Sequence, residues 1–224
     1  MANKELLDVL QSKLDQLKSL SLNSSICDSS NLQDRIIKDL LNDAVQLIEG
    51  AFLVSNAQLG TPLFVLMRVL CELMFRIDWI SLSSDNASEF EREVMSETVK
   101  LMSVNLERGR AKIVHKKTGE DYTNKVQDEL KTLKQPRKKI EDIAKELGLS
   151  KVYDTIYRSS SLEVHMKTFG GPSSSEEDAL YAGLAGIISI SKVIILIAEK
   201  KVLSNKTTSA DEIFKVLKLN IGGK

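Results

Sequence analysis

The stretch YDTIYRSSSLEVH, residues 153–165, combines side chains capable of chemistry at a regular spacing. Tyr153, Tyr157, Ser161 and His165 follow one another in steps of four, and Arg158 precedes the histidine by seven residues. On a helix, steps of four advance by about 40° and seven residues make almost two turns. The four residues therefore form a slanted ridge, and Arg158 shares a face with His165. Because helical side chains lean toward the N-terminus, we expect His165 to reach the Ser161 hydroxyl.

Arginine and histidine on one helix face suit RNA cleavage without a metal ion. A histidine can move the proton of a 2′-hydroxyl or of a leaving group near neutral pH, and a guanidinium can hold the phosphate. Arg158 starts about 10 Å from His165 along the helix axis, so either Arg158 would have to curl toward His165 or the two would have to reach one extended ligand. Tyr157 or Ser161 would then orient the phosphate or the imidazole. The same spacing also fits a packed helix whose tyrosines fill space, and in which His165 interacts with the helix C-terminus.

The second histidine offers a competing candidate site. Arg108 and Arg110 precede His115 by seven and five residues, inside the basic cluster 108–117. A further basic cluster covers residues 134–139, and either cluster could contact phosphate. Both clusters also fit a solvated helix face. The sequence has 31 basic and 31 acidic residues, so its net charge is zero. This favours the interpretation as a solvated face, because an uncharged protein does not attract nucleic acid through its overall charge.

A charged pair interrupts an apolar segment upstream. Arg68 and Glu72 are four residues apart, so they can pair on one helix, and an unpaired charge there would be costly. The pair is either a structural ion pair or a functional one. In the functional version, Glu72 faces His165 and orients its imidazole.

Hydrophobic periodicity predicts helices along the whole chain. The leucines of residues 3–20 form one stripe, Pro62 fits the first turn of a third helix, and Gly148 is a helix-ending signal. No strand alternation, hairpin or repeat is evident, so the predicted fold class is all-α. The expected helices cover residues 3–20, 32–58, 62–82, 84–116, 124–147 with a break near Pro136, the opening stretch, 176–203 and 211–219.

Composition and missing motifs narrow the classes of function. The two cysteines, Cys27 and Cys71, favour a reducing compartment, and the N-terminus lacks the pattern of a signal peptide. We therefore expect a cytoplasmic protein. There is no phosphate-binding glycine loop and no zinc-binding pattern, so we expect no cofactor and no metal. Residues 179–198 are long and apolar enough for a membrane span, but Lys192 and two serines favour a buried bundle helix.

Two segments together resemble a known family. RVLCE (residues 68–72) and AKELGLSKVYDTIYRSSSLEVH (residues 144–165) are similar to a bacterial family of unknown function with R-x3-E on an apolar helix and Y-x3-Y-x3-S-x3-H on a later one. That family is similar to the HEPN superfamily of helical bundles. The resemblance covers about residues 35–200. It implies a HEPN-like bundle over residues 31–205, with an extra N-terminal helix and linker at 1–30 and a C-terminal helix and tail at 206–224.

The resemblance also implies a function. Many HEPN domains are metal-independent endoribonucleases with an R-x4-6-H motif, which falls here on Arg158 and His165. Such domains often form homodimers and act in phage defence or toxin–antitoxin pairs, with RNA or an antitoxin as partner. The sequence departs from the commoner pattern at Ser159, where an amide is frequent. Other members are non-catalytic, so the alternative is a module that binds a protein or nucleotide partner through residues 3–20 and the C-terminal helix.

Overall fold

The computed structural model describes residues 2–23, 26, 30–132, 137–168 and 175–218, and in this part of the chain the fold is all-α, as predicted. No β-strand is present among these residues, apart from an isolated bridge between Val114 and Asp121. The helices are α1 (Ala2–Ser21), α3 (Leu32–Asn56), α4 (Thr61–Leu82), α5 (Ser84–Glu107), α6 (Thr123–Thr132), α7 (Ile140–Glu146), α8 (Ser150–Val152), the π-helix η1 (Tyr153–Tyr157), α9 (Arg158–Thr168), α10 (Glu176–Ser204) and α11 (Ala210–Leu217).

The chain forms two compact units, and each has its own interior. The larger unit contains residues 1–86 and 140–224, and the smaller contains residues 87–139. The predicted boundaries at residues 30 and 205 stay predictions. The leucine stripe of α1 is buried against α3 and α10, so α1 packs as part of the larger unit.

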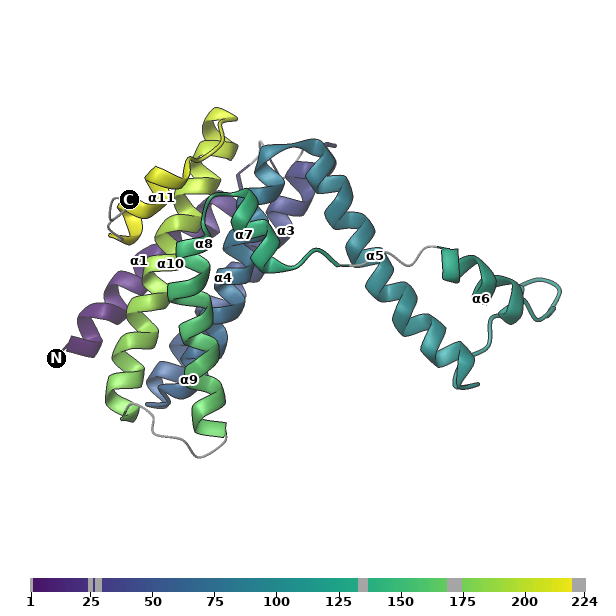
Figure 1. Cartoon of the computed structure of the whole chain (residues 1–224), viewed down its shortest axis with the longest axis horizontal. Helices are drawn as coiled ribbons and strands as arrows, with labels where there is room; N and C mark the ends of the chain where they lie inside the picture. Colours follow the sequence, from purple (N-terminus) through teal and green to yellow (C-terminus); the bar gives the residue numbers. More distant parts are fainter. Residues whose placement is uncertain (1, 24–25, 27–29, 133–136, 169–174, 219–224) are drawn as a thin grey trace. The chain divides into compact units, whose positions relative to one another are not determined.

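The larger unit is built around α4 and α10, which pack side by side (Figure 1). α1 and α3 cover one side of this pair, while α7, η1 and α9 pack against α4. Small residues permit the close approach of the two central helices. A Cβ atom at Gly183 of α10 would lie 2.6 Å from Leu63 Cβ of α4. The largest fully buried side chains of α4 are Phe75 and Trp79, so the centre of the core lies along this helix.

α10 is the candidate membrane span of the sequence. Among the described residues it is the one helix that is long and apolar enough to cross a bilayer, and 61% of its most apolar window is buried inside the bundle. Its ends are fixed by local signals. The Ser175 hydroxyl accepts a hydrogen bond from the Asp178 N–H, and Asn205 closes the helix in a left-handed conformation. Such burial is typical of the core helix of a bundle.

The smaller unit consists of most of α5, a loop and α6. Val99 and Leu106 of α5 pack with Leu130 of α6, and Ile113 and Val126 complete this small core. α5 ends at Glu107, earlier than the predicted residue 116, because Gly109 adopts a left-handed conformation with φ of 63°. The predicted break near Pro136 lies outside the described residues; α6 ends before it at Thr132, and α7 begins after it at Ile140.

Candidate functional site

The helical rod that carries the opening stretch changes its hydrogen-bond pattern at the site. Tyr153–Tyr157 form a π-helical turn, closed by the N–H of Arg158 donating to the carbonyl of Tyr153. In an α-helix, residues five apart point about 140° away from each other. The wider i→i+5 turn brings them close to alignment instead. The expected continuous α-helix was therefore wrong at this turn, and Arg158 comes to lie over Tyr153.

Two arginines flank a pair of stacked tyrosines, and we call this set the arginine–tyrosine stack. The rings of Tyr153 and Tyr157 are 4.9 Å apart and nearly parallel, with an interplanar angle of 18°. Arg158 Cζ lies 5.4 Å from the ring centre of Tyr153, and Arg68 Cζ lies 5.0 Å from that of Tyr157. Cation–π attraction thus holds a guanidinium at each end of the tyrosine pair.

Hydrogen bonds tie the stack to α4. The Tyr157 hydroxyl donates to Glu72 Oε1 at 2.8 Å and accepts from Arg68 Nη2 at 3.0 Å. Arg68 Nε also lies 3.7 Å from Glu72 Oε1, so the predicted pair is present and is bridged by a tyrosine. Partial burial and donation to Glu72 raise the pKa of Tyr157, against the opposing effect of Arg68. The phenol therefore stays protonated and keeps its hydrogen bond to Glu72.

Arg158 is exposed but not free. Its side chain is 59% exposed, with Nε 3.3 Å from Asp154 Oδ1 and Nη2 4.0 Å from Glu141 Oε1. The Asp154 contact joins residues four apart, so the sequence contained a signal for it. Glu141 lies on α7, and no local pattern could have placed it beside Arg158. A phosphate would have to compete with these two carboxylates.

The serines after the π turn bind the backbone. Ser160 is fully buried, and its hydroxyl donates to the Tyr157 carbonyl at 2.8 Å. The Ser161 hydroxyl donates to the same carbonyl at 3.0 Å. Ser161 was predicted as a site residue from its spacing, whereas Ser160 was not. Two hydroxyl donors on one carbonyl suit a turn whose backbone leaves the α-helical pattern.

His165 lies in α9, on the same helix as Arg158. Its side chain is outside the part of the chain that the structure describes. The expected contacts of His165 with Ser161 and Glu72 therefore stay predictions. Most of the other predicted site residues, by contrast, form one connected group, which consists of Arg68, Glu72, Tyr153, Tyr157 and Arg158.

His115 occupies a different setting, in an exposed loop of the smaller unit. Its Nδ1 lies 2.9 Å from the Thr118 hydroxyl, and its ring centre lies 5.9 Å from that of Tyr122. Lys116 and Lys117 beside it are exposed as well. The basic cluster 108–117 is thus a solvated loop that phosphate could reach. Tyr122 beside it also carries a cation, because Lys125 Nζ lies 5.5 Å from the centre of its ring.

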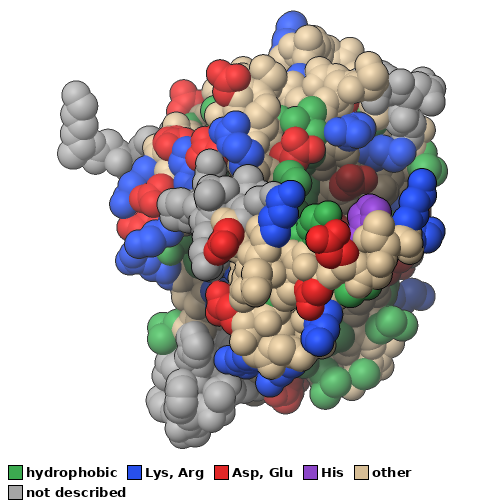
Figure 2. All heavy atoms as spheres, turned by 90° about the vertical axis from the view of Figure 1, so that its right-hand side faces the viewer, with side chains coloured by type: hydrophobic (Ala, Val, Ile, Leu, Met, Phe, Trp, Pro, Cys, Tyr) green, Lys and Arg blue, Asp and Glu red, His purple; other side chains and the backbone are tan. Residues whose placement is uncertain are grey.

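Charge is mixed on the face drawn in Figure 2, where Lys and Arg side chains alternate with Asp and Glu side chains. This agrees with the net charge of zero. No broad field of one sign is visible there to attract a polyanion. Recognition of phosphate at this surface would therefore depend on individual guanidinium groups. Among the residues described, no three or more His, Cys, Asp or Glu side chains gather to hold a metal ion.

Replacing Tyr157 with phenylalanine is expected to lower the free energy of unfolding by about 1–2 kcal/mol. The ring stack would survive, but Glu72 would lose its donor and Arg68 one acceptor. Urea denaturation of the purified variant measures the change. Tyr181→Phe removes a hydroxyl from an exposed ring and serves as the control. Equal stability of both variants would show that the bridge contributes nothing.

The fold and the site define the class of protein. It is an all-α bundle in which an ordered polar group, the arginine–tyrosine stack with Glu72, joins α4 to η1 and α9. The model of a family of unknown function, DUF5677, matches residues 34–171, more than half of the chain. The chain belongs to this family, which confirms the predicted membership of a family of unknown function. The matched range includes both R-x3-E and the tyrosine–serine–histidine helix. No curated protein and no solved structure matches the chain.

Proposed function

We propose that this protein is a metal-independent endoribonuclease with a HEPN-like fold. Arg158 binds the scissile phosphate, and His165 acts as acid–base catalyst. The observation that carries the proposal is the π turn, which fixes an exposed guanidinium over Tyr153 on the helix that bears His165. A guanidinium held this way loses little conformational entropy when it binds a phosphate.

The reaction would follow the chemistry of the two side chains. His165 takes the proton of the 2′-hydroxyl, whose oxygen then attacks the adjacent phosphorus, and the bond to the 5′-oxygen breaks. The products are a 2′,3′-cyclic phosphate and, once a proton is supplied, a 5′-hydroxyl. Arg158 stabilises the charge that develops on the phosphoryl oxygens. Arg68, at the other end of the stack, supplies a second partly exposed guanidinium for an extended RNA strand.

The biological setting of the proposal comes from the resemblance to HEPN domains. We infer a cytoplasmic effector in phage defence or in a toxin–antitoxin pair, with RNA as substrate and an antitoxin or another protein as regulator. The resemblance also implies a homodimer.

The second candidate function is a non-catalytic module that binds a protein or nucleotide partner. The carboxylates of Asp154 and Glu141 favour it, because they already neutralise the arginine that would bind phosphate. The surfaces expected for such binding need correction. The leucine stripe of α1 is buried in the bundle, and so are Ile213 and Phe214 of α11. A partner would have to bind the exposed polar faces of these two helices or another surface.

The test is cleavage of a mixed cellular RNA pool by the purified protein in EDTA, beside His165→Ala and His115→Ala. We expect wild type and His115→Ala to cleave equally and His165→Ala to lose at least about a hundredfold in rate. Loss in His115→Ala alone would move the site to the basic loop. If no version cleaves although circular dichroism shows that all are folded, the binding-module function is favoured.

A substitution at Asp154 separates the two candidate functions further. If Arg158 binds phosphate, Asp154→Asn removes a competitor and should tighten RNA binding and speed cleavage. If Arg158 serves only the fold, the same change costs at most about 1 kcal/mol of stability and leaves RNA binding unchanged. Lys18 of α1 and Glu49 of α3 form a similar exposed pair that shares no residue with the contacts of Arg158, so Lys18→Met is a control that breaks an ion pair elsewhere.

A further inference from the structure

The helix α5 carries an apolar face that nothing in the described chain covers. Val94 and Leu101 are seven residues apart, as are Met95 and Met102, so the four side chains share one broad face of the helix. All four are exposed, with Leu101 at 66%. We call this face the α5 stripe. Val99 and Leu106 lie on the adjoining face of the helix and pack into the small core with α6.

The smaller unit needs additional burial. Its core rests on three buried side chains and two partly buried ones, for residues 87–139. Chains of this size usually depend on a disulfide, a metal or a partner for stability. Neither cysteine of the sequence falls in this unit, and its described residues form no metal-binding group. A partner on the α5 stripe would supply the missing apolar contact.

The distribution of acidic and basic residues along α5 and the residues after it indicates which kind of partner would bind the α5 stripe. The segment 84–97 holds five acidic residues and one arginine, whereas the segment 98–112 holds four basic residues and one glutamate. The stripe straddles the boundary between these halves. A second copy running antiparallel would place the acidic segment 84–97 of each copy against the basic segment 98–112 of the other. In the basic segment, Lys100 lies on α5, while Arg108, Arg110 and Lys112 lie in the loop after it. Two-fold symmetry repeats this match on both sides.

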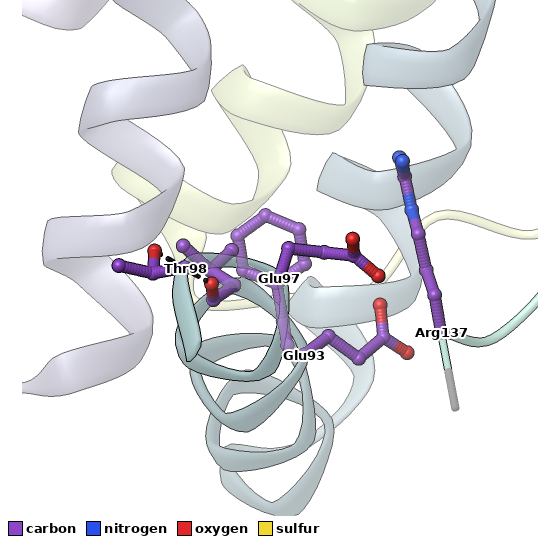
Figure 3. Close-up of a pocket in the computed structure, with 6 residues that line it drawn as sticks. Glu93, Glu97, Thr98 and Arg137 are labelled. Atoms are coloured by element: carbon purple, nitrogen blue, oxygen red, sulfur yellow. Dashed lines mark hydrogen bonds between the residues drawn. The ribbon is translucent and has the colours of Figure 1, made fainter. Parts of the chain in front are cut away.

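A groove lies beside the acidic half. Phe90, Val94 and Thr98 line a cavity of about 290 Å³ together with Glu93, Glu97 and Arg137. Figure 3 shows the carboxylates of Glu93 and Glu97 both directed toward the side of Arg137. Glu93 is buried and accepts a hydrogen bond from the Lys138 N–H, while Glu97 is exposed. The groove therefore combines an apolar wall with an exposed carboxylate. It could bind a partner segment in which an apolar side chain is followed by a basic one.

We propose that the α5 stripe is a self-association surface on which two copies of this chain pair their α5 helices antiparallel. The proposal stands on the smaller unit alone and does not depend on ribonuclease activity. It places the dimer contact on α5, where the exposed apolar side chains and the complementary charges coincide.

The first test is the molar mass of the full chain across a concentration series by sedimentation velocity. We expect wild type to approach twice the monomer mass, and Leu101→Glu to need at least about tenfold more protein to associate. Leu203→Glu is the matched control, since Leu203 on α10 is 63% exposed and lies off the stripe. A wild type that stays monomeric throughout overturns the proposal. Co-sedimentation with lipid vesicles would then show whether a bilayer covers the stripe instead.

The second test uses charge reversal. One chain carries Glu91→Lys and Glu97→Lys, and the other carries Arg108→Glu and Arg110→Glu. Each alone brings like charges together and should remain monomeric, whereas an equimolar mixture restores opposite charges at both ends and should form a heterodimer. Homodimers of either chain, or a mixture that stays monomeric while circular dichroism shows intact helices, would overturn the antiparallel arrangement.

Discussion

Raising the pH from about 4 to above 7 is expected to weaken the fold by roughly 4 kcal/mol through Asp78 alone. Asp78 is only 2% exposed, and among the described residues its Oδ1 has no hydrogen-bond partner. Burial raises the pKa of this carboxyl from 3.8 to about 7, because the charged form would lose its water.

The direction of the pH effect follows from that shift. Below pH 3.8 the carboxyl is protonated in both the folded and the unfolded chain, so it costs nothing. Between 3.8 and about 7 the unfolded chain ionises while the folded chain holds its proton, and stability falls steadily. Above about 7 the full loss is reached. The stabilising effect of the neutral carboxyl is thus a low-pH effect, opposite to that of a carboxylate in a salt bridge.

Urea denaturation of wild type and Asp78→Asn at a series of pH values measures this effect. The asparagine imitates the neutral carboxyl, so the two proteins should differ little at low pH, and the variant should be more stable by up to about 4 kcal/mol at pH 8. Asp85→Asn removes a charge that water solvates and gives the baseline. A difference between Asp78→Asn and wild type that does not change with pH would contradict the prediction.

Gly60→Ala is expected to destabilise the protein by about 2–3 kcal/mol. Gly60 lies where the chain enters α4, against the first turns of α10. An added Cβ would lie 2.5 Å from the Leu180 nitrogen and 2.6 Å from the Glu176 carbonyl oxygen. Both atoms belong to helix backbone, which cannot move without displacing α10. The backbone of Gly60 has φ of −75° and ψ of −46°, so the cost is steric and not conformational.

Gly50→Ala provides the matched comparison in α3. Its added Cβ would meet only Leu66 Cδ1, at 3.9 Å, an ordinary contact. Alanine within a helix is favoured over glycine, so this variant should gain about 0.5–1 kcal/mol. Chemical denaturation of both variants should therefore show shifts of opposite sign. Equal and small shifts would mean that the approach of α10 to Gly60 is looser than the structure has it.

Much of the fold could be predicted from sequence, because the hydrophobic periodicity and the helix-end signals indicate the same helix bounds. The bounds of α1, α3, α4 and α10 fall within two residues of expectation. The end of α5 was missed although Gly109 marks it. The division into two units could not be predicted, because no change in composition accompanies it and only the contacts among helices define it.

The candidate site was predictable in its residues and not in its geometry. The spacing of Arg68 and Glu72 predicted their pairing, and the tyrosines were singled out by their period of four. The Tyr157 hydroxyl links the two segments, although it is separated along the chain from Glu72 by 85 residues and from Arg68 by 89. Hydrophobic periodicity gives no information on contacts between residues so far apart in the sequence. The π turn likewise has no local sequence signature that distinguishes it from an α-helix.

That turn has a further consequence for how the chain can change. A π turn holds one more residue than the α-helical path needs, so Tyr153–Tyr157 behaves as a built-in insertion. Deleting one residue here would remove the extra residue and restore a regular α-helix, and the helix after the turn would keep its orientation. Inserting a residue into the α-helical part of α9 would instead rotate the residues that follow, His165 among them if it is placed before that residue, by about 100°. The five positions of the π turn therefore tolerate the loss of one residue better than the regular helix after them does.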